Sequence, residues 1–317
     1  IDKLGTKTGY ALSLVGWSLA AVAHAFVAST GGFMLVRAAL GATESGNFPA
    51  AIRAITEYFP RRERAFATGI FNSGTNIGAV IAPLSVPFIA AAFGWRMAFV
   101  ITGATGFIWL IFWYRYYEIP SRQKRLSRAE FDYIHSDVDE QPKIVEDAKP
   151  PVSWGRLLSF RQTWAFAVGK FLTDGVWWFY LFWLPDFLFE QYGLGKTGIA
   201  LPIALVYTLA GFGSVLGGWL PMFLMKKGWP VFRARKTSML LYAVSVLPVL
   251  AAQYLGTVNM WYAVLIIGFA TASHQAWSAN IFTTVSDMFP KFTVAAMVGI
   301  GGFADGLGAI MSSKSAG

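Results

Sequence analysis

The chain has 317 residues, of which 55% are apolar, 16% are aromatic and only 14% carry a formal charge. An average soluble domain carries roughly 25% charged residues, and even a large soluble domain keeps much of its surface in water. The composition therefore excludes a soluble domain and predicts an integral membrane protein. Because the sequence has no cysteine, it also excludes disulfides, zinc–thiolate sites and cysteine nucleophiles.

Nine apolar runs are each long enough to cross a bilayer, which takes about 20 helical residues. The runs are continuous rather than alternating, so they predict α-helices instead of barrel strands. We expect the spans at residues 8–30, 33–58, 64–93, 95–117, 161–189, 199–225, 236–254, 259–288 and 292–312. Since the sequence opens within a polar segment and has an odd number of spans, we also expect a fragment that lacks helices at both ends.

Lysine and arginine residues are concentrated in every second connection between these spans. Of the 26 such residues, 20 lie at residues 3–7, 61–64, 115–161 and 226–236 and at position 291. Cytoplasmic loops carry this excess in membrane proteins. We therefore expect the first residues and the 118–160 connection to be cytoplasmic, in a multi-pass protein of the inner (plasma) membrane. The net charge of +9 is then a topology signal that needs no nucleic acid as a partner.

The single long connection, residues 118–160, divides the chain into two expected bundles. Ser127 and Glu130 have the spacing of a capping box, which predicts a short helix in the connection. Residues 143–151 have the composition of a flexible linker. We expect residues 1–117 to form an N-terminal bundle and residues 161–317 a C-terminal bundle.

The two expected bundles share an internal repeat. Residues 59–80 and 289–310 are identical at seven of 22 positions at a fixed offset of 230. An even number of spans separates the copies, so they point the same way, as in two parallel six-helix halves related by an axis along the membrane normal. The same offset aligns Glu44 with His274, which places two ionisable groups at equivalent depths.

Four segments of the sequence resemble the motifs of a known transporter group. Residues 2–7 (DKLGTK) resemble the end of the D-[RK]-x-G-x-[RK] loop of the major facilitator superfamily. Residues 37–49 resemble the R-x-x-x-G-x-x-E-x-x-x-x-P fourth helix of its anion:cation symporter family. Residues 170–180 and 274–280 are most similar to the bacterial hexuronate transporter branch.

This resemblance covers essentially the whole chain and implies its architecture. The implied fold is an all-α major facilitator fold of two pseudo-symmetric six-helix bundles, of which this sequence supplies helices three to eleven of twelve. The resemblance also implies a gating loop formed by Asp2, Gly5 and Lys7.

Arg37 and Glu44 are charged residues inside the second span. A charge at the bilayer centre costs at least about 2.5–3.5 kcal/mol, so these residues are candidates for function. They are seven residues apart, two helical turns or about 10.5 Å along one face. The resemblance assigns them to proton coupling, with the arginine holding Glu44 ionised until it is displaced. The alternative is a fixed ion pair that braces two helices.

The eighth and third spans carry polar side chains that suit a polyhydroxylated anion. Imidazole titrates near neutral pH and also forms hydrogen bonds with hydroxyl groups. We expect substrate binding by His274, Gln275, Trp277, Ser278 and Asn280, together with Asn72, Thr75 and Asn76. The alternative is a buried polar network that packs helices together.

The fifth span carries Lys170 and Asp174 one turn apart, followed by Trp177 and Trp178. Substrate contact and an ordinary i,i+4 ion pair are both open interpretations of the charged residues. Both tryptophans are candidate substrate contacts, or else they face lipid or the helix core. Asp305, in the ninth span, faces either a cavity or an accessible end of its helix.

These features predict a proton-coupled symporter that imports a hexuronate or related sugar acid by alternating access. The expected partners are a small organic anion, protons and the lipid bilayer, and we expect a monomer without a metal or cofactor. Other carriers remain open, for a dicarboxylate, an aromatic acid or phosphate, as does an anion channel. We expect no enzyme, because the sequence places neither a membrane-embedded nucleophile nor paired catalytic aspartates.

Overall fold

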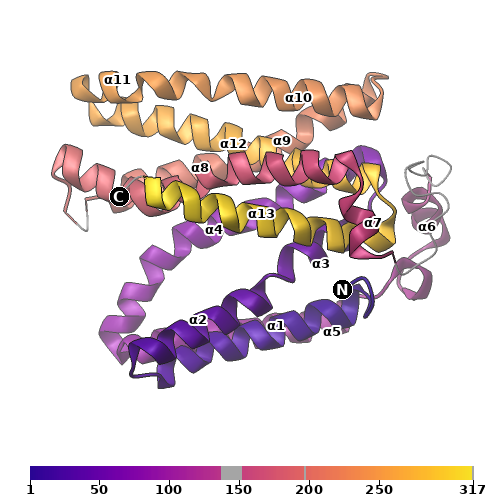
Figure 1. Ribbon diagram of the computed structural model, residues 1–317, viewed down its shortest axis with the longest axis horizontal. Helices are drawn as coiled ribbons and strands as arrows, with labels where there is room; N and C mark the ends of the chain where they lie inside the picture. Colours follow the sequence, from indigo (N-terminus) through magenta and orange to yellow (C-terminus); the bar gives the residue numbers. More distant parts are fainter. Residues whose placement is uncertain (137–151, 196–197, 316–317) are drawn as a thin grey trace. The chain divides into compact units, whose positions relative to one another are not determined.

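The structure, a computed structural model, describes residues 1–136, 152–195 and 198–315 (Figure 1). Within these ranges the secondary structure consists of α-helices and short 3-10 helices, without strands. This confirms the all-α fold that the continuous apolar runs predict.

The nine predicted spans all fall on helical segments, and six segments of the described residues are long and apolar enough to cross a membrane. These six are Thr6–Phe26, Arg61–Phe93, Trp95–Tyr116, Ala200–Lys226, Val231–Val258 and Lys291–Ser312. The predicted spans at residues 33–58, 161–189 and 259–288 lie outside this set. The first is interrupted, and the other two helices carry Lys170, Asp174, His274 and Gln275, which lower their hydropathy.

The chain divides into two compact units, which we describe separately. The first consists of Ile1–Tyr58, Leu84–Ser153 and Phe289–Gly299. Its elements are α1 (Thr6–Ala23), η1 (His24–Phe26), α2 (Thr30–Glu44), α3 (Asn47–Tyr58), α5 (Trp95–Tyr116), η2 (Pro120–Arg122), α6 (Arg128–Ile134) and η6 (Lys291–Thr293), with parts of α4 (Arg61–Phe93) and α13 (Val294–Ser315).

Glycines allow α5 to lie directly against α1 in the first unit. A Cβ atom at Gly103 would lie 2.8 Å from a methyl carbon of Val22, and one at Gly106 would lie 2.0 Å from the Ser18 hydroxyl. His24 is buried at the end of α1, where its ring stacks on Phe99 at 5.0 Å between centroids. These contacts hold α1 and α5 together through packing.

The predicted continuous span at residues 33–58 is wrong, because the helix is interrupted between Glu44 and Asn47. Proline has no N–H group, so Pro49 cannot donate to the carbonyl of Ser45 four residues earlier. Gly46 lies against α1, where a Cβ atom would be 2.0 Å from the hydroxyl of Ser13. The break makes Glu44 the last residue of α2.

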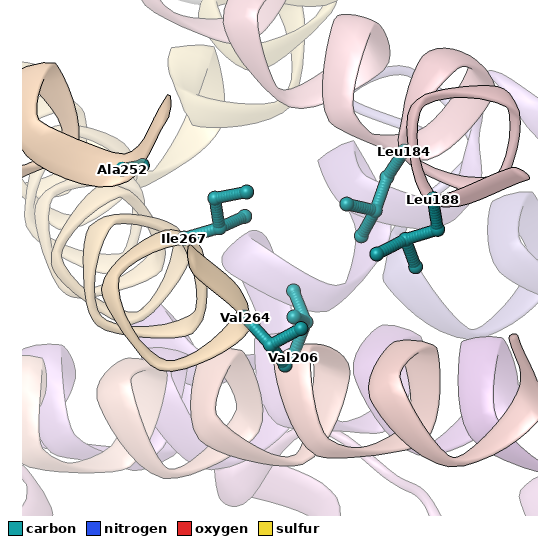
Figure 2. Packing of buried hydrophobic residues seen from close by; sticks show 6 residues of the cluster. All are labelled: Leu184, Leu188, Val206, Ala252, Val264 and Ile267. Carbon is teal, nitrogen blue, oxygen red and sulfur yellow. The ribbon is translucent and has the colours of Figure 1, made fainter. Parts of the chain in front are cut away.

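The second unit consists of Phe59–Pro83, Trp154–Met288 and Ile300–Gly317. It contains the first part of α4, the last part of α13, and the elements α7 (Trp154–Leu158), α8 (Arg161–Tyr192), α9 (Ala200–Lys226), α10 (Val231–Ser245), η5 (Leu247–Ala251), α11 (Ala252–Val258) and α12 (Met260–Met288). A buried apolar cluster joins α8, α9, α11 and α12, and Figure 2 shows its members: Leu184, Leu188, Val206, Ala252, Val264 and Ile267.

Small residues bring α9 into backbone contact with α12. A Cβ atom at Gly213 would lie 2.2 Å from the carbonyl oxygen of Ala272, and one at Gly217 would lie 2.2 Å from the Cα atom of Ala276. This approach leaves no room for larger side chains. The contact fixes the stretch of α12 that carries His274 and Gln275.

The predicted helix in the long connection is confirmed as α6. The Ser127 hydroxyl accepts a hydrogen bond from the Glu130 backbone, and the Glu130 carboxylate accepts one from the Ser127 backbone. The predicted linker at residues 143–151 lies outside the described residues. The division into bundles at residues 118–160 stays a prediction.

Candidate functional site

His274 lies between α8 and α12 with one ring nitrogen bonded and the other open. Its Nε2 atom is 2.9 Å from the carbonyl oxygen of Thr173 and 3.8 Å from a carboxylate oxygen of Asp174. A carbonyl oxygen only accepts hydrogen bonds, so Nε2 carries the proton in the neutral ring and Nδ1 is an acceptor. Nδ1 is buried, and no donor among the described residues reaches it.

An indole ring stacks on the imidazole of His274. The ring of Trp177 is nearly parallel to that of His274, with 6.0 Å between centroids and 11° between planes. Tyr207 of α9 contacts Trp177 edge-on, with 5.8 Å between ring centroids. The predicted site residues His274 and Trp177 therefore lie together.

Lys170 and Asp174 form a buried ion pair one turn before Trp177. The side chains of Lys170 and Asp174 are 2% and 9% exposed. The Lys170 ammonium also lies 4.0 Å from the ring centroid of Phe282 on α12, a cation–π contact. A buried lysine needs a partner of opposite charge, and Asp174 provides it here.

Trp178, the next predicted residue on α8, binds a carboxylate of another helix. Its indole Nε1 atom donates a hydrogen bond of 2.9 Å to Asp305 on α13. Asp305 thus faces α8 rather than an accessible end of its own helix.

The polar residues of α4 connect with α12 through an amide pair. The Asn72 amide donates to the side-chain oxygen of Gln275 over 2.7 Å and to the hydroxyl of Ser214 over 3.1 Å. Thr75 instead donates to the backbone carbonyl of Asn72, and its residue is exposed. Of the predicted residues on α4, Asn72 therefore meets α12 directly.

Asn76 lines a cavity of about 290 Å³ between α4 and α9. Most of the lining is apolar, and Tyr207 belongs to it. The side-chain oxygen of Asn76 is buried, without a hydrogen-bond donor among the described residues. Since Tyr207 also touches Trp177, the cavity lies one side chain away from the indole beside His274.

Three other predicted residues of α12 form no side-chain hydrogen bond with His274 in the described part of the chain. Asn280 donates to the carbonyl oxygen of Gly217 over 2.8 Å. Trp277 lies beside Gly169 of α8, where a Cβ atom would be 3.5 Å from the indole. Ser278 is buried on the same helix.

Arg37 and Glu44 lie on α2, in the first unit, and both are exposed. The two charges interact electrostatically, but their side chains do not form an ion pair in the described part of the chain. No residue of α2 is buried within the unit. Their assignment to proton coupling stays a prediction.

The predicted gating residues join three segments of the first unit. One Asp2 carboxylate oxygen accepts from Arg53 over 2.8 Å, and the other accepts from the backbone N–H of Ala296, in the first turn of α13, over 2.7 Å. Burial raises the pKa of Asp2, although both partners oppose this change. Gly5 precedes α1 with φ of 77°, a conformation that favours glycine.

Lys7 pairs with Glu118, beyond the end of α5, over 2.9 Å. The hydrogen bond from the Lys7 ammonium lowers the pKa of Glu118. The gating residues therefore contact α3, the segment after α5, and α13 by different bonds.

Sequence reasoning missed a buried charge cluster in the second unit. Asp287 pairs with Arg235 of α10, and Arg64 of α4 lies 3.9 Å from the same carboxylate. Arg64 and Arg235 also donate to backbone carbonyls, of Ser286 and of Arg61, over 2.9 Å each. The internal repeat could have drawn attention to Asp287, because its offset of 230 aligns this residue with the acidic Glu57.

Comparison with known proteins identifies the family of the chain. Residues 1–313 match the Major Facilitator Superfamily. The chain belongs to the Major Facilitator Superfamily. The superfamily and the relatives below are transporters, which confirms that the chain is a multi-pass membrane protein and not an enzyme.

Two curated relatives within the superfamily carry substrate names. The hexuronate transporter of Escherichia coli (strain K12) is 36% identical over 304 residues, 95% of this chain and 69% of that protein. The galacturonate transporter of Dickeya chrysanthemi is 38% identical over 226 residues, 71% of this chain and 65% of that protein.

A solved superfamily structure has the same fold. The proton:xylose symporter XylE, bound to 6-bromo-6-deoxy-D-glucose, superposes with a TM-score of 0.77 at 17% identity, over 99% of this chain and 73% of that one. The major facilitator fold that the sequence motifs imply is therefore confirmed.

Proposed function

We propose that the protein is a proton-coupled symporter that imports a hexuronate or a closely related sugar acid. The names of its relatives from Escherichia coli and Dickeya chrysanthemi support this substrate class. The observation that carries the proposal is the open, buried Nδ1 acceptor of His274, whose ring stacks on the indole of Trp177 and whose Nε2 atom lies 3.8 Å from Asp174 of the ion pair.

The chemistry of this cluster is complementary to a sugar acid. A buried acceptor without a donor is costly, and a substrate hydroxyl group would satisfy Nδ1 of His274. The Lys170 ammonium supplies a cation for the substrate carboxylate, in exchange for Asp174. The indole of Trp177 offers a flat apolar surface for the C–H face of a sugar ring. Each of the three features of a hexuronate thus has a counterpart.

For the coupling reaction, we propose Glu44 as the proton carrier and Arg37 as the cation that keeps it ionised. A carboxylate gives up or takes a proton as its arginine engages or withdraws. The matching family motif supports this assignment. Alternating access would then come from rocking of residues 1–117 against residues 161–317, with the 118–160 connection in the cytoplasm.

The test is uptake of radiolabelled sugar acids by the protein, in its complete form, in proteoliposomes at two external pH values. We expect uptake of galacturonate or glucuronate to increase when the external solution is more acidic, because protons enter with the substrate. Uptake that does not change with external pH would contradict proton coupling. A preference for an aromatic acid or a dicarboxylate would contradict the proposed substrate class.

Substitution of His274 tests the acceptor directly. Glutamine can replace Nε2 as the donor to Thr173 but supplies no acceptor at the position of Nδ1. For His274→Gln we expect KM to rise about tenfold, as for the loss of one hydrogen bond to the substrate. His24→Gln is the matched control, because His24 also has one ring nitrogen on a carbonyl oxygen (Nδ1 to Ala20, 2.8 Å) and a buried Nε2 without a donor among the described residues, but its ring stacks on Phe99 and not on Trp177. Equal KM values for His274→Gln and wild type would refute this role.

A further inference from the structure

Asp305 is a charged residue of the second unit that the proposed function leaves without a role. It is half-buried on α13, and its carboxylate accepts the indole hydrogen bond of Trp178 over 2.9 Å. Among the described residues, no basic side chain forms a direct ion pair with it. A carboxylate inside a membrane span without a bonded cation calls for a functional explanation.

Backbone contact between α8 and α13 holds Asp305 close to the ion pair of α8. A Cβ atom at Gly308 would lie 2.2 Å from the carbonyl oxygen of Phe171, and one at Gly175 would lie 3.1 Å from the carbonyl oxygen of Gly308. Asp305 precedes Gly308 by three residues, about one helical turn. It therefore lies on the side of α13 that meets α8.

The formal charges of the ionisable groups on the three neighbouring helices do not sum to zero. Lys170 and Asp174 come from α8, His274 from α12 and Asp305 from α13. Lys170 is bonded to Asp174 and also interacts electrostatically with Asp305. With His274 neutral, one ammonium group faces two carboxylates, and the cluster has one negative charge in excess. Binding of one proton would remove this charge from a region where an unpaired charge is costly.

We propose that Asp305 is a second proton-binding group, which takes up a proton as the substrate anion binds. The step rests on the proposed function. The substrate carboxylate bonds to Lys170, which weakens the hold of the ammonium on both aspartates, and Asp305 takes a proton from water on the outer side. The proton leaves to water on the inner side when the substrate departs. With one further proton on Glu44, each monoanion enters with two protons, and one net positive charge moves inward.

Net charge movement is measured by uptake under an imposed membrane potential. The assay uses proteoliposomes with radiolabelled galacturonate and a potassium gradient with valinomycin. At 100 mV, inside negative, one net charge raises the accumulation ratio by up to about 50-fold. We expect this response in the wild type and its loss in Asp305→Asn, which would accumulate substrate through the pH gradient alone. Asp186→Asn, an exposed acid on α8, is the matched control and keeps the response.

The result that overturns the proposal is a potential response in Asp305→Asn equal to that of the wild type. Absence of sugar-acid uptake in the wild type would overturn the proposed function, and this inference with it. If Asp305→Asn does not fold, the variant Trp178→Phe tests proton binding by Asp305 instead. It removes the donor that favours the charged carboxylate, so the pH midpoint of uptake should rise by about one unit. An unchanged midpoint would contradict proton binding by Asp305.

Discussion

Removal of Lys170 from the buried Lys170–Asp174 pair should destabilise the protein more than removal of Asp174. A buried charge that loses its partner costs about 3–5 kcal/mol. Lys170→Met leaves two carboxylates, Asp174 and Asp305, without their ammonium, and we expect the full cost. Asp174→Asn leaves Lys170 with Asp305 as an alternative partner, so we expect less than half of this loss. The double variant Lys170→Met/Asp174→Leu removes both charges of the pair and leaves only the half-buried Asp305 without the ammonium, so it should recover more than half of the lost stability.

The measurement is thermal unfolding of the purified protein in detergent. With an unfolding entropy of about 2.1 cal/mol/K per residue, 1 kcal/mol corresponds to about 1.5 °C in Tm for 317 residues, so Lys170→Met should lower Tm by about 5–7 °C and Asp174→Asn by less than half of this. Uptake of galacturonate by the double variant separates the two interpretations of the pair. If the double variant recovers both Tm and uptake, the pair is only a brace between helices. Recovery of Tm without uptake supports substrate binding by Lys170. Equal losses in the two single variants would refute the reasoning about Asp305.

Two further predictions concern packing and pH. Gly217→Ala places a methyl group against the Cα atom of Ala276 and should lower the free energy of unfolding by about 1–3 kcal/mol. Gly211→Ala, on the same helix, is the control, because its Cβ atom would lie at an ordinary 3.6 Å from Asn76. Its Tm should stay within a degree or two of the wild type. Glu118 has its pKa lowered by the hydrogen bond from Lys7, so this pair stabilises the folded state above pH 4.5, the ordinary value for the group, and the stabilisation is lost as the pH falls through the lowered pKa. Tm measured between pH 6 and pH 3 should therefore fall more steeply in the wild type than in Glu118→Gln, and parallel curves would contradict the pairing.

Features that depend on near neighbours in the sequence could be predicted. The continuous apolar runs indicate helices because each run needs only its own residues to satisfy its backbone. The capping box of Ser127 and Glu130 closes over three residues, and α6 begins there. Lys170 and Asp174 are one turn apart on α8, so the sequence alone places them side by side.

Contacts between distant helices could not be predicted, because they depend on which faces meet. Asn72 and Gln275 are 203 residues apart, and Trp178 and Asp305 are 127 apart. Periodicity identifies neither pair, since the apolar moment of a membrane helix does not distinguish a neighbouring helix from lipid. The break before Pro49 was visible as a proline, but the apolar character of residues 33–58 hid it.

The bond between Asp2 and Ala296 has a consequence for the order of assembly. Its partners are separated by 294 residues, so the ribosome must deliver residues 2–296 before this contact can form. Until α13 has been synthesised, the Asp2 carboxylate has its bond from Arg53 but lacks the one from the backbone N–H of Ala296. Contacts of such long sequence separation form late and slowly. The contact that joins residue 2 to α13 should therefore be among the last to form during biogenesis.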